Sequence, residues 1–152
     1  MGKDKVVISI GRQYGSGGRE IGRRLAEIFN IKFYDKELIT LAAKQSGFSE
    51  DVLKENDEKH NGSFLYSLVM GTYTGGDNLP LNHKLFLAQF DTIKKLAEEE
   101  SCVIIGRCAD YALEYNPNCV KAFIRADIDT RIKRAINEYG VNPETVEEKI
   151  KK

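Results

Sequence analysis

The chain of 152 residues is long enough for one domain of ordinary size with a sizeable core. Apolar residues make up 41% and charged residues 30%, and 23 basic side chains balance 23 acidic ones. This balance argues against a general nucleic-acid or membrane-surface binder, and no apolar run is long enough to cross a bilayer. We therefore expect a soluble globular protein with no nucleic-acid or membrane partner.

The cysteines and the N-terminus bear on the compartment. Cys102, Cys108 and Cys119 are odd in number and lack the spacing of a metal site. The first ten residues lack the layout of a secretory signal. These features predict reduced thiols in a cytoplasmic protein.

The N-terminal half begins with an alternation of strands and helices. Residues 5–10, KVVISI, are mostly β-branched and end at Gly11, which predicts a short buried strand. Apolar residues recur at helical spacing over 21–29 and predict an amphipathic helix. The next expected elements are a strand over 31–34, a helix over 36–45 and a helix over 50–56.

The pattern breaks between His60 and Lys84. Glycines, a proline and few charges there predict a mobile segment or substrate loop. The remaining expected elements are a helix over 86–97, strands over 102–106 and 119–126, a helix that Asp129 begins, and a last helix with Asn142 as its N-cap.

Strands that alternate with helices imply an α/β fold, in which helices cover both faces of a parallel sheet in three layers. We expect the strand over 5–10 to be central. Ligands of such sheets bind past the carboxyl ends of the strands. The site is therefore expected after Ile10, Tyr34 and Ile105.

A glycine cluster follows the first strand and precedes a helix. Its backbone N–H groups and the positive end of the helix dipole favour an anion. The cluster departs from the P-loop pattern, because Gly18 occupies the lysine position and Arg19 the hydroxyl position. A tight turn without a ligand is the alternative to a phosphate site. The expected phosphate-binding loop comprises Arg12, Gly15, Ser16, Gly17, Gly18 and Arg19.

Four segments resemble the cytidylate kinase-like family, a branch of the P-loop nucleoside monophosphate kinases. They are ISIGRQYGSGGREIG, FYDKELI, VIIGRCADYAL and FIRADIDTRIKRAINEYG, in the family's order and over nearly the whole chain. The resemblance implies a five-stranded parallel sheet, ATP as phosphoryl donor, a nucleoside monophosphate such as CMP as acceptor, and Mg²⁺. Residues 1–152 would form one nucleotide kinase-like domain, with an acceptor-binding insert at about 60–84 and the start of a lid at about 129–152.

The resemblance also assigns acceptor residues. Arg107 would grip the acceptor phosphate, for which a guanidinium is well shaped. Asp110 lies two residues beyond the family's aspartate position, which Cys108 occupies here. Asp35 would line the acceptor pocket, or it would cap the helix that follows. The alternative for Arg107 is an ion pair with a surface carboxylate.

The lid would carry Arg131 and Arg134, three residues apart on one helical face. By resemblance they close over the transferred phosphoryl group. The alternative is a solvated basic face. Because Gly18 supplies no cation, Arg12, Arg19 or the lid arginines are expected to replace the missing lysine, with Arg19 as a further catalytic cation. Glu20 would hold Mg²⁺ directly or through water, or it would pair with an arginine.

Two functions remain open. One is phosphotransfer from ATP to a nucleoside monophosphate, and the other is a catalytically weak or inactive nucleotide-binding module with a regulatory role. Only four strands are counted where the family has five, so the last strand is expected beyond Lys152. An open sheet edge would favour a homo-oligomer.

Overall fold

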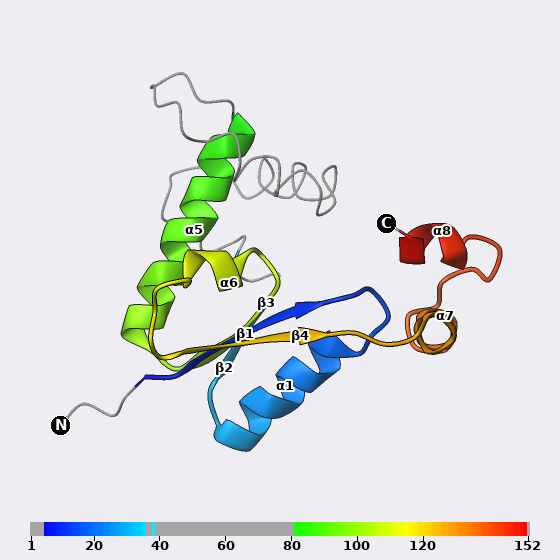
Figure 1. Ribbon diagram of the computed structural model, residues 1–152, viewed down its shortest axis with the longest axis horizontal. Helices are drawn as coiled ribbons and strands as arrows, with labels where there is room; N and C mark the ends of the chain where they lie inside the picture. Colours follow the sequence, from blue (N-terminus) through cyan, green and yellow to red (C-terminus); the bar gives the residue numbers. More distant parts are fainter. Residues whose placement is uncertain (1–4, 36–37, 39–80, 152) are drawn as a thin grey trace.

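The computed structural model describes residues 5–35, 38 and 81–151 (Figure 1). The helices expected over 36–45 and 50–56 and most of the segment 60–84 lie outside the described residues. The described elements are β1 (Val7–Arg12), α1 (Gly18–Phe29), β2 (Lys32–Tyr34), α5 (Leu81–Glu99), β3 (Cys102–Ile105), α6 (Ala109–Ala112), β4 (Cys119–Ile124), α7 (Ile128–Asn137) and α8 (Val146–Lys151).

The described strands form one parallel sheet in the order β2-β3-β1-β4. Val7 of β1 lies opposite Cys102 on one side and Cys119 on the other. The prediction of a parallel sheet with β1 at its centre is confirmed. Because the strands are parallel, their carboxyl ends meet at one edge of the sheet.

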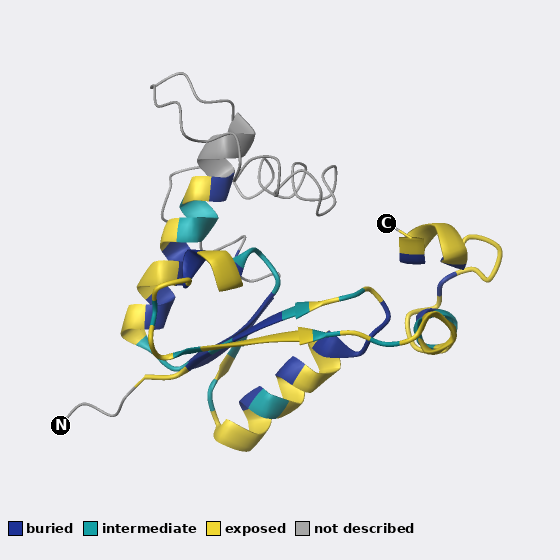
Figure 2. Cartoon of the chain, viewed as in Figure 1, coloured by how far each residue is buried: buried dark blue, intermediate teal, exposed yellow. Residues whose placement is uncertain are grey.

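Helices cover both faces of this sheet (Figure 1). On one face, Ala26 and Leu25 of α1 pack against Ile10 and Val103. On the other face, α5 and α6 pack against alternate strand residues, such as Ile104. The predicted three-layer α/β fold is therefore confirmed, and its core lies around β1 and β3, which are the most buried strands in Figure 2.

Close packing of α1 on the sheet depends on one glycine. A Cβ added at Gly22 would lie 2.4 Å from Cδ1 of Ile105 and 3.2 Å from Cδ1 of Ile10. A larger side chain would therefore push the helix away from β1 and β3. The absence of that side chain lets α1 begin directly beside the carboxyl end of β1.

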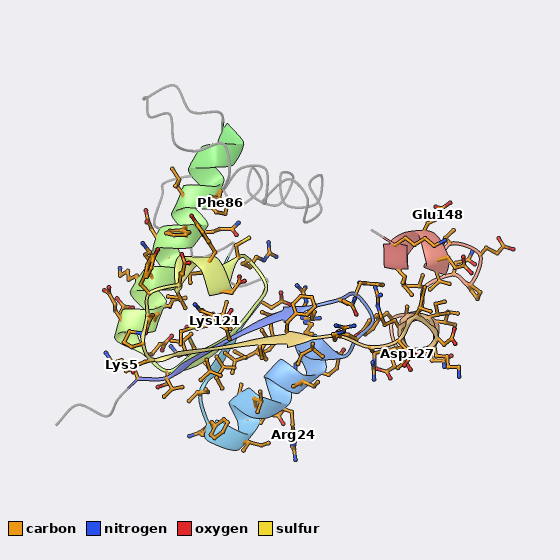
Figure 3. All side chains as sticks on the ribbon, in the orientation of Figure 1. Lys5, Arg24, Phe86, Lys121, Asp127 and Glu148 are labelled. Atoms are coloured by element: carbon orange, nitrogen blue, oxygen red, sulfur yellow. The ribbon has the colours of Figure 1, made fainter. Side chains whose placement is uncertain are left out.

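Two helix starts differ from the sequence prediction. Helix α5 begins at Leu81, inside the segment that its glycines and proline marked as irregular. Helix α7 begins at Ile128 rather than Asp129, because Asp127 is the N-cap and its Oδ1 accepts from the N–H of Thr130 at 2.8 Å. Figure 3 labels Asp127 at this entry to the helix. Two aspartates two residues apart made the cap ambiguous in the sequence.

Two further differences lie near the C-terminal half. The short helix α6 was not predicted, since four residues are too few for a periodic pattern. Helix α8 begins only at Val146. The Oδ1 of Asn142 accepts from the N–H of Glu144 at 2.9 Å. This hydrogen bond stabilises a turn before α8, so Asn142 is not the N-cap of the helix.

Helices α7 and α8 pack on each other beyond the carboxyl end of β4 (Figure 1). They share a small apolar cluster that includes Ala135, Val146 and Ile150. This pair therefore stands beside the edge of the sheet where a ligand is expected. None of the helices that the structure describes is both long and apolar enough to span a bilayer.

Strand β4 forms one edge of the described sheet and pairs with β1 only. Its side chains are largely exposed (Figure 2), with Val120 at 56% and Phe123 at 63% of full exposure. The predicted self-association through an open edge stays a prediction.

Candidate functional site

The glycine loop runs from the end of β1 into α1. Gly15 and Gly17 have φ angles of 79° and 84°, which favour glycine, and Gly17 is the N-cap of α1 without a side-chain hydrogen bond. The N–H of Ser16 donates to the carbonyl oxygen of Gln13 at 3.1 Å and closes the turn. The loop therefore places small residues at the N-terminus of a 12-residue helix, as a phosphate site requires.

Ser16 carries the clearest sign of a ligand. Its residue is only 7% exposed, and its buried Oγ has no hydrogen-bond partner. Among the described residues, no other buried side-chain nitrogen or oxygen lacks a partner. A buried hydroxyl without a partner costs free energy, so native structures rarely leave one. An anion at the start of α1 would accept a hydrogen bond from this hydroxyl.

Arg19 and Asp35 come together, although they were expected to serve different substrates. The Nε of Arg19 lies 2.8 Å from Oδ2 of Asp35, whose side chain is 8% exposed. Asp35 thus stands beside the first turn of α1, which follows the glycine loop. The Asp35 carbonyl oxygen accepts from the N–H of Leu38 at 3.3 Å.

The turn after β3 has an unusual backbone. Gly106, Arg107 and Cys108 have φ angles of 63°, 59° and 53°. Two consecutive non-glycine residues in this region cost free energy and occur preferentially at functional sites. The strained turn holds the half-buried Arg107 at the carboxyl end of β3, beside the start of α6.

Asp110 lies in the first turn of α6 and is exposed. Burial raises the pKa of the neighbouring Cys108 thiol, and the charge of Asp110 raises it further. The thiol is therefore protonated near neutral pH, so the turn offers charge and hydrogen bonds and not a thiolate nucleophile.

Arg131 and Arg134 both reach the glycine loop from α7. The Nε of Arg131 donates to the carbonyl oxygen of Tyr14 at 2.7 Å, and its Nη2 donates to that of Ile150 at 3.0 Å. The Nη1 of Arg134 donates to the carbonyl oxygen of Gly15 at 3.0 Å. The two arginines therefore hold the loop by its carbonyl groups and tie it to α7 and α8.

Tyr139 adds a third connection between α7 and the start of α1. Its hydroxyl donates to Oε1 of Glu20 at 2.9 Å, and its ring centroid lies 5.8 Å from that of Tyr14. Burial raises the pKa of Tyr139 to about 12, and the hydrogen bond to Glu20 contributes to the rise. Glu20 is thus fixed beside the loop.

A magnesium site needs oxygen ligands. The described residues contain no cluster of three or more acidic, histidine or cysteine side chains that could hold a metal ion. Mg²⁺ commonly takes only one or two carboxylates and completes its shell with phosphate oxygens and water. The fixed carboxylate of Glu20 at the mouth of the loop fits that requirement.

The sequence interpretation missed the roles of Tyr139 and Gln13. Tyr139 was regarded only as the end of a helix, and its contact with Glu20 spans 119 positions. Gln13 Oε1 accepts from the N–H of Ala126 at 3.2 Å and joins the loop to the segment after β4. Neither contact leaves a local pattern in the sequence.

Comparison with known proteins agrees with this geometry. The profile of the cytidylate kinase-like family matches residues 7–152. No curated protein matches the chain. A similar solved structure is the crystal structure of an uncharacterized protein from Eubacterium ventriosum ATCC 27560, with 32% sequence identity and a TM-score of 0.65. The match covers 97% of this chain and 70% of that one. The parallel sheet, the glycine loop and the family match together show that the chain belongs to the cytidylate kinase-like family.

Proposed function

We propose that this chain is a phosphotransferase that moves the γ-phosphoryl group of ATP to a nucleoside monophosphate such as CMP. The observation that carries the proposal is the buried, unpartnered hydroxyl of Ser16 at the N-terminus of α1. Membership in a kinase-like family supports a nucleotide kinase-like role. The acceptor and the activity are the parts that we propose.

On the donor side, the phosphate groups of ATP would lie against the glycine loop. Gly15, Gly17 and Gly18 would contribute N–H groups, Ser16 would contribute its hydroxyl, and Arg12 and Arg19 would contribute positive charge. Mg²⁺, when bound, would neutralise charge on the phosphate oxygens, and Glu20 would hold it directly or through water.

On the acceptor side, Arg107 would bind the phosphate of the nucleoside monophosphate. The strained turn around Arg107 supports this role, since it holds the side chain at the carboxyl end of β3. Asp110 and Asp35 would line the same pocket. We also propose, from the family resemblance, that residues 60–84 form the acceptor-binding insert and that residues 129–152 begin the lid of a single domain.

Arg131 and Arg134 would act on the transferred phosphoryl group. Phosphoryl transfer depends on positioning and charge stabilisation more than on covalent chemistry of the protein. In the structure, both side chains lie at the loop but donate to its carbonyl oxygens. Contact with the phosphoryl group would therefore require these side chains to exchange a carbonyl partner for a phosphate oxygen.

A coupled assay tests this proposal. ATP would be offered with CMP, UMP, dCMP or AMP, and ADP formation would be followed with and without Mg²⁺. The proposal predicts acceptor-dependent ADP formation with at least one monophosphate, and Arg107→Ala should need a higher acceptor concentration to reach the same rate. ADP formation that is equal with and without acceptors would indicate a nucleotide hydrolase instead.

A second function is favoured by two observations. Gly18 stands where phosphate loops usually carry lysine, and the lid arginines are engaged with loop carbonyls. A nucleotide-binding module with weak or no turnover would need neither lysine nor mobile arginines. Tight ATP binding without ADP formation for any acceptor would establish this alternative.

We further propose a cytoplasmic location, because Cys102, Cys108 and Cys119 are all free thiols. Burial raises the pKa of Cys102 to about 12, so this thiol is inert inside the core. We propose nucleotides as partners. We also propose a homo-oligomer through the β4 edge, which sedimentation would test against a monomer.

A further inference from the structure

The side chain of Arg12 spans the distance between the donor loop and the acceptor turn. Arg12 is the last residue of β1, at the carboxyl edge of the sheet. A Cβ added at Gly18 would lie 2.5 Å from Cβ of Arg12 and 3.1 Å from its Cγ. A Cβ added at Gly106 would lie 2.6 Å from Nη1 of Arg12. The stem of Arg12 therefore passes over the start of α1, and its guanidinium lies against the turn after β3.

The other arginines near the loop are already engaged. Arg19 pairs with the buried carboxylate of Asp35. Arg131 and Arg134 donate to loop carbonyl oxygens. Among the residues that the structure describes, no carboxylate lies within ion-pair distance of Arg12, whose side chain is exposed. An exposed guanidinium that packs against two glycines and pairs with no carboxylate of the described residues can bind an anion from solution.

We propose that Arg12 is the cation that contacts both the terminal phosphate of the donor and the phosphate of the acceptor, in place of the lysine that is absent at Gly18. The inference rests on the proposed function and assigns it a catalytic residue. A guanidinium suits this place, because its planar fork offers several N–H groups to two sets of oxygens at once. A lysine at Gly18 would also clash with the stem of Arg12.

The same arrangement explains two glycines that belong to different segments. Gly18 is the first residue of helix α1, and a side chain there would meet Arg12 and Ile124. Gly106 has a φ angle of 63° and would meet Nη1 of Arg12. The Arg12 side chain packs against both glycines as it extends from the end of β1 to the end of β3.

Inorganic phosphate chains of two lengths test the inference by calorimetric titration at fixed ionic strength. Pyrophosphate is short enough to occupy the donor loop alone, whereas linear tetraphosphate extends toward the acceptor turn. We expect wild-type protein to bind tetraphosphate more tightly than pyrophosphate. Arg12→Gln should lose roughly tenfold or more in tetraphosphate affinity and less than about threefold in pyrophosphate affinity.

Matched variants distinguish the proposed Arg12–phosphate contact from a general effect of positive charge. Arg24→Gln removes the same charge from the side of α1 that points away from the sheet (Figure 3), and it should change neither affinity by more than about twofold. Ser16→Ala should weaken both probes, because it alters the donor loop itself. In the wild-type background, Gly106→Ala should abolish the preference for tetraphosphate over pyrophosphate. In the Arg12→Gln background, the same substitution should cause little further loss of tetraphosphate affinity.

The outcomes are distinct. If wild type binds both probes and Arg12→Gln weakens them equally or not at all, Arg12 does not connect the two sites and the inference is overturned. If wild type binds neither probe, the proposed phosphate site fails and the inference fails with it. Thermal unfolding of each variant establishes that it is folded, and Arg12→Lys, which keeps charge and stem, should recover part of the tetraphosphate preference.

Discussion

Arg19 Nε lies 2.8 Å from Oδ2 of Asp35, and this ion pair joins the first turn of α1 to the end of β2. A cation in the first turn of a helix is unfavourable, because it faces the positive end of the dipole. The buried carboxylate of Asp35 offsets that cost. The pair therefore ties the start of α1, where the glycine loop ends, to the end of β2.

Removing Arg19 should destabilise the fold. Arg19→Gln removes the cation that lies 2.8 Å from the buried carboxylate of Asp35, and we expect a loss of about 1–2 kcal/mol in the free energy of unfolding. This figure is at the lower part of the range for charged groups, since the Arg19 side chain is 45% exposed. Urea unfolding measures it. Arg24→Gln is the control, because the Arg24–Glu27 pair is exposed on both sides and should contribute less than about 0.5 kcal/mol. Equal effects of the two substitutions would show that the Arg19–Asp35 pair is a surface contact only.

Arg131 should couple α8 to the glycine loop. Arg131→Ala removes the hydrogen bonds to the carbonyl oxygens of Tyr14 and Ile150. We expect amide hydrogen exchange in α8 to accelerate roughly fivefold to tenfold, in line with about 1 kcal/mol for a hydrogen bond. Lys133→Ala, on the exposed side of α7, should leave exchange in α8 unchanged. Unaltered exchange in Arg131→Ala would mean that the apolar cluster alone holds α8.

Tyr139 should make stability depend on alkaline pH. Burial and the hydrogen bond to Glu20 raise its pKa in the folded state to about 12, from an unfolded value near 10. The folded state therefore retains its proton more strongly. The stabilisation is fully present below pH 10 and is lost as pH rises through the folded pKa near 12. Urea unfolding of wild type and Tyr139→Phe between pH 9 and about 11.5 measures it, and the difference in stability between the two should shrink as pH rises. A difference that stays constant with pH would show that the Tyr139 pKa is not shifted.

Arg107 and Arg134 should affect different kinetic constants in a chain that turns over. Arg107→Ala should chiefly raise KM for the acceptor, by roughly tenfold, because it removes a contact with the bound phosphate. Arg134→Ala should chiefly lower kcat, by roughly a hundredfold, since we propose that Arg134 acts on the transferred phosphoryl group. The coupled assay measures both constants. A fall in kcat for Arg107→Ala with no change in KM would place Arg107 with the transfer machinery instead.

The sequence predicted the fold well where the signal is local or repeated. The β-branched run before Gly11 and the apolar spacing over 21–29 predicted β1 and α1, and the alternation of elements predicted the parallel order. Family resemblance was confirmed by the match over residues 7–152. The start of α7 was displaced by one residue, because either Asp127 or Asp129 could serve as its cap.

The partners within the site could be predicted less well. Asp35 was expected in the acceptor pocket or as a cap, and its ion pair with Arg19 depends on how α1 packs beside β2. The Tyr139–Glu20 hydrogen bond likewise depends on where α7 stands relative to the loop. Such contacts arise from the packing of distant elements, and a single sequence contains no pattern that encodes them.

Titration of ATP into the wild-type chain and into Gly17→Val tests most directly whether the glycine loop binds phosphate. Gly17 has a φ angle of 84°, and a Cβ there would lie 3.1 Å from the Arg134 guanidinium, so valine should distort the loop. Gly140→Val is the control, because Gly140 also has a positive φ angle of 65° but open space around it. We predict that wild type and Gly140→Val bind ATP by calorimetry, whereas Gly17→Val remains folded and loses binding. ATP affinity that is unchanged in Gly17→Val would show that the loop is only a turn.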